Sequence, residues 1–417
     1  MKRKGILGGI FAMVLILALA LVLGAGSVSA AEPTIVGSGN CGDNGANVTW
    51  TLDSNGLLTI SGTGEMADYE GKSVSSGEEE EFSSNAPWED YIKKVKTVMI
   101  EGGVTGIGNY AFCGCTNMTS VTMGSTVTSI GEGAFLDCRG LTSVTIPDSV
   151  TSLSGFDGCT GLTSVEIPNS VTGIGLSAFH GCTGLTSVEI PDSVTSIGDG
   201  AFAGCTGLTS VEIPNSVTSI GDGAFAGCTG LTGIEIPEGV TKIGLGAFRD
   251  CKNLAEVRYN NKAVAEMPYA PGFEEREIPD EEHAFFGAGT NTDGMTVVFG
   301  SGVKEIPKYL FYNCTSLTSV TIPNSVTCIG YDAFIGCTGL KEVHFIGTEE
   351  EWKAISIGPN NDPLINAAIT YDGPVTGTCG ENLTWTLDST GLLTISGTGT
   401  MADYETQYDA AGELITT

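Results

Sequence analysis

Apolar residues recur every 23 positions through the middle of the chain. Residues 185–207 read LTSVEIPDSVTSIGDGAFAGCTG, and residues 208–230 repeat them with one change, Asn215 in place of Asp192. Two steps depart from the period, one of 21 residues and one of 40, the latter containing a 17-residue insertion. The pattern predicts a stack of eleven units. Their central positions are Val98, Val121, Val144, Val165, Val188, Val211, Ile234, Val257, Val297, Val320 and Val343.

One unit contains a short strand and two turns. Leu208, Val211 and Ile213 alternate with polar residues, which predicts a strand, and Pro214 ends it because proline has no N–H to donate. Burying about seven apolar side chains contributes at most roughly 10–20 kcal/mol. Ordering 23 residues costs roughly 23–46 kcal/mol. A lone unit therefore cannot fold, whereas neighbours that share a core can, as in a solenoid.

The repeat frame L-x-x-V-x-I-P-x-x-V-x-x-I-G-x-x-A-F-x-x-C resembles the BspA-type leucine-rich repeat of bacterial surface and secreted proteins, over about residues 94–372. The resemblance implies a right-handed superhelix, mainly β, with a parallel sheet on one face and short turns, 3-10 or helical pieces on the other. It also implies a secreted or surface location and a role in adhesion.

Two flanking segments are copies of each other. Residues 48–69 and 383–404 match at 19 of 22 positions, and each predicts a β-hairpin. We expect a cap module over residues 31–93, the solenoid over 94–346 with an insertion within about 259–296, and a closing element over 347–373. Residues 374–417 form a partial second copy of the cap module, which fits either a longer natural protein or a truncated one.

The N-terminus predicts export. Lys2, Arg3 and Lys4 precede an apolar stretch from residue 6 to 23, and Val28-Ser-Ala30 offers small residues for cleavage. Residues 1–30 are therefore interpreted as a signal peptide, with an uncleaved membrane anchor as the alternative. After cleavage we expect no membrane insertion and a secreted or cell-surface protein.

The formal net charge of −31 narrows the range of partners. Such an acidic surface repels phosphate backbones and anionic lipid, which excludes nucleic-acid binding. Basic partners and divalent cations remain compatible with this charge.

The exposed middle residue of each strand forms the main candidate binding column. Glu166, Glu189, Glu212 and Glu235 occupy it in four successive units, and Arg258 follows. One interpretation is a solubilising face that discourages lateral association. The other is a docking stripe for a basic ligand or Ca²⁺, although no D-x-[DN]-x-[DN]-G loop supports calcium.

The insertion supplies the other candidates, Tyr269 and Phe273, followed by Phe285 and Phe286. Aromatic residues on a loop held by a rigid frame suit recognition. The alternative, equally open, is that these aromatic side chains fold back to fill the interrupted core.

No motif points to catalysis or to a cofactor. His180, His283 and His344 lack zinc-protease spacing and are expected on the solvated surface, and no long helix follows the Gly-rich segments. One cysteine recurs in nearly every unit, which predicts a column of reduced core thiols rather than a disulfide ladder.

The resulting hypothesis is an exported, non-catalytic protein that binds a protein or glycan partner at the bacterial cell surface. The alternatives are a passive spacer within a larger surface protein and a secreted carboxylate-dependent hydrolase.

Overall fold

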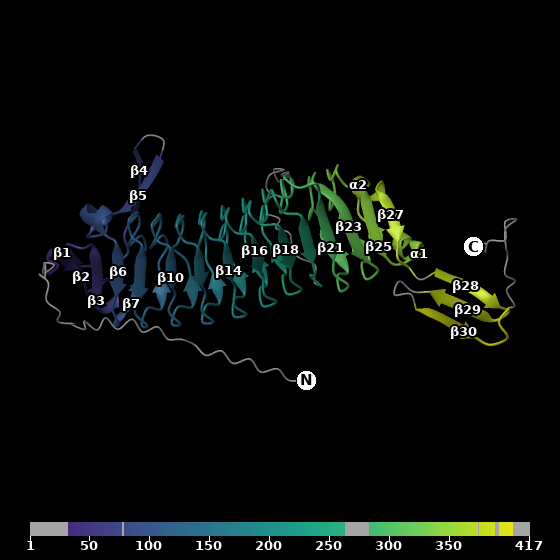
Figure 1. Ribbon diagram of the computed structural model, residues 1–417, viewed down its shortest axis with the longest axis horizontal. Helices are drawn as coiled ribbons and strands as arrows, with labels where there is room; N and C mark the ends of the chain where they lie inside the picture. The colour runs from purple at the N-terminus through teal and green to yellow at the C-terminus, as the bar shows by residue number, and fades with distance from the viewer. Residues whose placement is uncertain (1–31, 77–78, 263–282, 374, 388–391, 403–417) are drawn as a thin grey trace, which may run out of the picture.

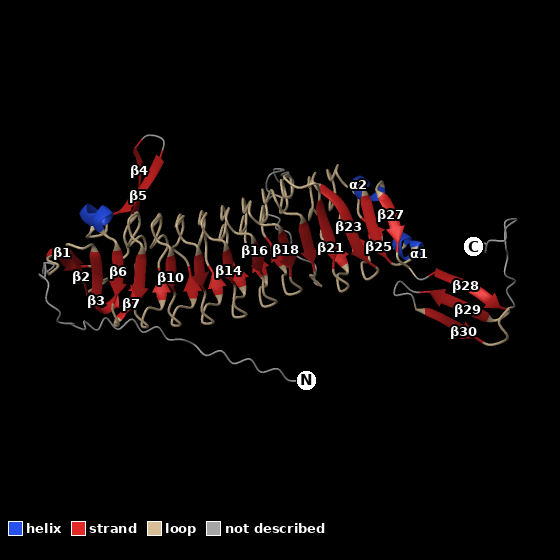
Figure 2. Cartoon of the chain, in the orientation of Figure 1, coloured by secondary structure: helices blue, strands red, loops and turns tan. Residues whose placement is uncertain are grey.

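Each repeat forms one coil, and the coils stack into an elongated β-solenoid (Figure 1). The computed structural model describes residues 32–76, 79–262, 283–373, 375–387 and 392–402. Strands and turns make up nearly all of it, with helical turns only near the two ends of the solenoid (Figure 2). This confirms the predicted repeat solenoid with parallel sheets.

The first sheet, as we call it, is the row of central strands from all eleven units, and it consists of three ladders that follow one another along the solenoid. Within its ladders the strands are parallel and in register, so that Val165 lies opposite Val188, and Val188 opposite Val211. The valines point into the core, and the residues on either side of each valine face outward. The strands are β6 (Thr97–Ile100), β8 (Ser120–Met123), β10 (Ser143–Thr145), β12 (Ser164–Glu166), β14 (Ser187–Glu189), β16 (Ser210–Glu212), β18 (Gly233–Ile236), β20 (Glu256–Tyr259), β21 (Met295–Phe299), β23 (Leu317–Pro323) and β25 (Glu342–Ile346), followed by β27 (Ala368–Tyr371).

A second set of parallel strands, mostly of two residues, follows the turn after the first strand of each coil. Its isoleucines are buried, as Ile197 and Ile220 illustrate. Its ladder from β11 to β19 is separate from the ladder that starts at β22, and the coil between them contains the undescribed residues 263–282. The strands are β7 (Val104–Ile107), β9 (Ser129–Ile130), β11 (Ser152–Leu153), β13 (Gly173–Ile174), β15 (Ser196–Ile197), β17 (Ser219–Ile220), β19 (Lys242–Ile243), β22 (Glu305–Ile306), β24 (Cys328–Ile329) and β26 (Ser356–Ile357).

A column of stacked aromatic rings fills the third side of the core. Ring centroids of successive members lie 5.0–5.8 Å apart. The backbone continues the stack, because the N–H of Phe202 donates to the carbonyl of Ala224 one coil later (2.7 Å). The column consists of Trp88, Phe112, Phe135, Phe156, Phe179, Phe202, Phe225, Phe248, Phe285, Phe311 and Phe334.

The cysteines lie beside this column as free thiols. All thirteen are free, and all but the half-buried Cys328 are buried. In seven coils the Sγ donates to the carbonyl of the phenylalanine one coil earlier, as Cys205 does to Phe179 (3.1 Å). These contacts pair the thiols with backbone carbonyls of the preceding coil.

The N-terminal end of the core is covered by an antiparallel sheet of three strands, β1 (Ile35–Asn40), β2 (Asn47–Asp53) and β3 (Leu57–Glu65). The long strand β3 pairs in parallel with β6 and, further along, with β7, so it closes both sheets. Next to it, the indole of Trp88 is buried and donates to the carbonyl of Ala111 (2.9 Å). A hairpin of β4 (Gly71–Ser76) and β5 (Glu79–Ser84) projects from this end (Figure 1), and the 3-10 helix η1 (Glu89–Lys94) leads into the array.

The C-terminal end is closed by α1 (Glu349–Lys353), α2 (Asp362–Ile365) and β27. Thr348 and Glu351 form a capping box at α1, and Trp352 of that helix is buried. The buried Asn361 replaces the missing next coil, because its Oδ1 accepts from the N–H of Phe334 (2.9 Å) while its amide donates to Gly330 and Gly358 carbonyls.

A separate three-stranded antiparallel sheet follows the solenoid (Figure 1). Its strands are β28 (Val375–Gly380), β29 (Leu383–Leu387) and β30 (Leu393–Gly397), in the same order as β1–β3. Among the described residues, no helix is both long and apolar enough to span a bilayer.

Candidate binding face on the first sheet

The outer side of the first sheet aligns three of the predicted glutamates. Thr145, Glu166, Glu189 and Glu212 lie directly opposite one another on β10, β12, β14 and β16, and all four are exposed. Neighbouring strands lie about 4.8 Å apart, so the carboxylates form a regular row along the solenoid axis. Within the described part of the chain, none of these three glutamates forms a salt bridge.

These glutamates line a shallow groove. One hollow of about 590 Å³ is lined by Thr145, Glu166 and Glu189, and an adjoining hollow of about 550 Å³ by Glu189 and Glu212. The two hollows share Glu189, so they form one groove across four strands, called here the acidic groove. The groove is also lined by the prolines that follow these strands and by the residues after them, namely Pro147, Asp148, Pro168, Asn169, Pro191, Asp192 and Pro214.

Sequence analysis did not single out Asp148, Asn169 and Asp192 as candidate site residues. All three are exposed, and they add two carboxylates and an amide to the glutamate row. The available signal was the Pro-Asp or Pro-Asn pair that closes each strand at a constant position, because constant positions in a repeat lie side by side in the stack.

The other two predicted members of the column are already engaged by neighbouring side chains. Asn260 donates to Glu235 (2.7 Å), and Arg258 forms an ion pair with Glu256 (2.6 Å). Glu235 lies opposite Arg258 on the paired strands β18 and β20. Among the described residues, the row of glutamates without a side-chain hydrogen-bond partner therefore ends at Glu212.

The structure describes only some of the aromatic residues predicted in the insertion. Tyr269 and Phe273 lie outside the described residues. Phe285, by contrast, is buried and continues the aromatic column, with its ring centroid 5.0 Å from those of Phe248 and Phe311. For this aromatic residue, the expectation of core filling holds.

The expectation of three solvated histidines is wrong for His283. Its side chain is buried, because it stacks on Tyr312 (3.9 Å between centroids) and contacts Tyr309. His180 is half exposed, and its hydrogen bond with Asp157 (2.9 Å) raises its pKa. His344, exposed at 40%, lies between Thr370 (2.9 Å) and Asp372 (2.7 Å).

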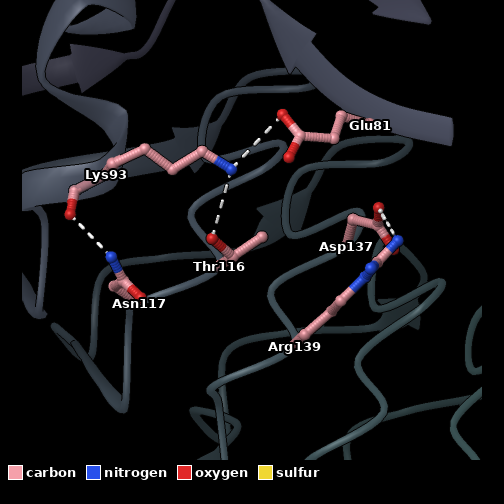
Figure 3. A network of polar contacts seen from close by, with 6 residues as sticks. All are labelled: Glu81, Lys93, Thr116, Asn117, Asp137 and Arg139. Atoms are coloured by element: carbon pink, nitrogen blue, oxygen red, sulfur yellow. Dashed lines mark hydrogen bonds and ion pairs between the residues drawn. The ribbon is translucent and has the colours of Figure 1, made fainter. Parts of the chain in front are cut away.

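A polar network at the base of the β4–β5 hairpin has a structural role. Lys93 Nζ lies 3.6 Å from Glu81 and 3.5 Å from the Thr116 hydroxyl, while Asn117 donates to the Lys93 carbonyl (2.7 Å) (Figure 3). The network joins η1 to both β5 and the first coil. Its charged side chains are about half exposed, so the ion pair contributes about 1 kcal/mol at most.

The acidic groove is chemically suited to binding cationic groups. Its carboxylates are exposed acceptors held at fixed spacing by the sheet. In the described ranges, no three or more His, Cys, Asp or Glu side chains converge in a way that could hold a metal ion.

Comparisons with known proteins agree with the repeat architecture. A family profile described as "BspA type Leucine rich repeat region" matches in six copies, over residues 90–175, 154–268 and 281–356. No match to a curated protein sequence was found.

Solved structures of bacterial leucine-rich proteins are also similar to this chain. A leucine rich cell surface protein from Faecalibacterium prausnitzii is 26% identical, with 78% of this chain and 98% of that chain covered and a TM-score of 0.33. A leucine-rich repeat protein from Bacteroides ovatus is 23% identical, with coverage of 78% and 88% and a TM-score of 0.48.

Proposed function

Because the chain belongs to the BspA-type leucine-rich-repeat family, we propose that it is an exported, non-catalytic binding protein that recognises a partner at the bacterial cell surface. The partner class that the acidic groove suits best is a protein with an extended basic segment. A glycan carrying positive charges is the second candidate.

The observation that carries this proposal is the in-register row of Glu166, Glu189 and Glu212. Like charges directly opposite each other destabilise a sheet. The fold does not require glutamate at this position, since other coils hold Thr122, Thr145 or Thr321 there. A cationic partner that neutralises the row would recover the electrostatic free energy that repulsion costs the free protein.

The groove supports binding better than hydrolysis. A carboxylate-dependent hydrolase needs one carboxylic acid kept protonated by an apolar environment while its partner stays ionised. Glu166, Glu189 and Glu212 share one exposed environment, and no feature of the groove distinguishes one of them as the acid.

The test compares binding by two variants of equal charge. The first, the groove variant, carries Glu166→Gln, Glu189→Gln and Glu212→Gln in the groove, together with Glu235→Gln, the fourth glutamate of the predicted column. The control carries four Glu→Gln changes at exposed sites away from the groove, at Glu65, Glu101, Glu350 and Glu381. The probes are a labelled lysine-rich peptide and a panel of purified matrix proteins and glycans, at 150 mM salt.

We expect the groove variant to bind the peptide, and any matrix ligand, at least tenfold more weakly than the control variant. An equal loss of binding in both variants would show that the partner is attracted by the overall negative charge and not by the groove. Absence of binding by the unmodified protein to every probe would favour the passive spacer.

A further inference from the structure

The last two strands of the first sheet bring together a threonine, a histidine and an aspartate. His344 of β25 lies directly opposite Thr370 of β27. Its Nδ1 is 2.9 Å from the Thr370 hydroxyl, and its Nε2 is 2.7 Å from the Asp372 carboxylate. Thr370 and Asp372 are exposed and the imidazole is 40% exposed, so a dissolved molecule can reach all three side chains.

These two contacts fix the tautomer of the neutral imidazole. An ionised aspartate can only accept a hydrogen bond, so the Nε2 atom of His344 carries the hydrogen that it donates to Asp372. The Nδ1 atom of the same neutral ring has a lone pair, and the Thr370 hydroxyl donates to it. His344 is therefore placed to take the proton of Thr370, while Asp372 holds the ring in the tautomer that can do so.

A hydroxyl bonded to a base that a third group orients is the arrangement that activates a nucleophile. Other exposed threonines of the same strand position do not have it. Thr145 lies opposite Glu166, and Thr122 lies opposite Met99. The chain therefore contains its own reference threonines, which share the fold around Thr370 and differ in the neighbouring side chain.

We propose that Thr370 is an acyl-acceptor nucleophile, which forms an ester with activated acyl compounds such as thioesters and aryl esters. Its oxygen attacks the acyl carbon while the hydroxyl proton passes to Nδ1 of His344. The tetrahedral intermediate then expels the thiolate or aryl oxide, which takes up that proton. The products are the Thr370 ester and a free thiol or phenol, and no oxidant or reductant is consumed. This covalent modification site is independent of the acidic groove.

The test exposes the full chain to p-nitrophenyl acetate, and in a second arm to an acetyl thioester, at neutral pH. Peptide mapping by mass spectrometry then measures acetylation at each threonine. We expect Thr370 to be acetylated at least tenfold faster than Thr145, because only Thr370 has a general base beside it. Hydroxylamine, which cleaves esters more readily than amides, should remove the label from Thr370.

Substitution of the base gives the sharpest comparison. We expect His344→Gln to slow acetylation of Thr370 at least tenfold. His180→Gln, at another partly exposed histidine, is the matched control and leaves this rate unchanged. Both positions are on the surface, and circular dichroism checks that each variant keeps the fold of the wild type.

Asp372 acts through His344 and is a positioning residue, so its test follows the ring as well as the rate. An amide can donate to Nε2 as well as accept from it, so Asp372→Asn no longer fixes the tautomer. We expect long-range ¹H–¹⁵N spectra of histidine-labelled protein to show a single Nε2–H tautomer for His344 in the wild type and a mixture in the variant. Acetylation of Thr370 should slow in parallel.

Two results would overturn the proposal. The first is acetylation of Thr370 that is no faster than that of Thr145. The second is an equal rate at Thr370 in the wild type and in the His344→Gln variant, which would show that the histidine does not act as the base. A slower reaction of Asp372→Asn with an unchanged tautomer would contradict the positioning role of Asp372.

Discussion

The repeated buried cysteines contribute to both the packing and the hydrogen bonding of the array. The repeated position is buried beside the aromatic column, and a carbonyl from the preceding coil faces it. A thiol fills the space and donates weakly to that carbonyl, as in Cys228 to Phe202 (3.1 Å). Burial raises the pKa of Cys228 to about 12, so these thiols stay protonated and poorly nucleophilic.

This protonation predicts a loss of stability at alkaline pH. The folded protein holds thiol protons that the unfolded chain releases above its ordinary pKa of about 9, so the free energy of unfolding falls as pH rises from about 9 toward 12. We expect the Tm, followed by circular dichroism, to be nearly constant from pH 7 to 8.5 and to decrease above pH 9. A variant with Cys182→Ala, Cys205→Ala and Cys228→Ala serves as control and has a shallower decrease. Parallel curves for the two proteins would refute the assignment.

The turn before each phenylalanine keeps one backbone conformation although different residues occupy it. Its first position has a left-handed backbone in coil after coil, with φ of 59° at Gly200 and Gly223. Some coils place other residues there, including Ser177 at 49° and Tyr110 at 54°. The turn therefore dictates the conformation, and glycine adopts it with least strain.

We expect Gly200→Ala to destabilise the protein by about 1–2 kcal/mol through the left-handed conformation. An added Cβ would meet nothing closer than the Ser177 hydroxyl, at 3.4 Å, so backbone strain is the main cause. Gly233→Ala is the control, because its φ is ordinary and the nearest atom to the new Cβ is 3.8 Å away. Urea unfolding midpoints measure both. An equal shift for the two variants would contradict the role of φ.

At the scale of the whole molecule, the dominant feature is the high negative charge of an elongated solenoid. The whole chain has a net charge of −31, and among the acidic side chains of the described residues only Asp137 is buried. Self-repulsion of this kind opposes the folded state and is screened by salt.

Adding salt should therefore stabilise the array. Between 10 and 150 mM NaCl the screening length falls from about 30 to about 8 Å. We expect the Tm to rise by roughly 2–4 °C, which corresponds to about 1 kcal/mol. The variant with glutamine at the four glutamate positions of the column should respond less steeply. A Tm that does not change with salt in either protein would show that repulsion contributes little.

The coil and its stacking follow from the sequence alone, because each buried position repeats and each coil's neighbour is nearly identical. The apolar positions Leu208, Val211 and Ile213 of one unit are all buried, and so are their copies in the next unit, Leu231, Ile234 and Ile236. The exposed glutamate column follows from the same period.

Only the tertiary structure decided the features that break the period, because they depend on contacts between segments that do not repeat. Asn361 replaces a missing coil, His283 is buried by Tyr312, and Glu235 is engaged by Asn260. The N-terminal sheet β1–β3 and the C-terminal sheet β28–β30 have almost the same sequence. The side chains of Leu58 and Ile60 are nevertheless buried, whereas those of Leu393 and Ile395 are exposed. Whether an apolar face becomes core depends on what packs against it, and no local pattern contains that information.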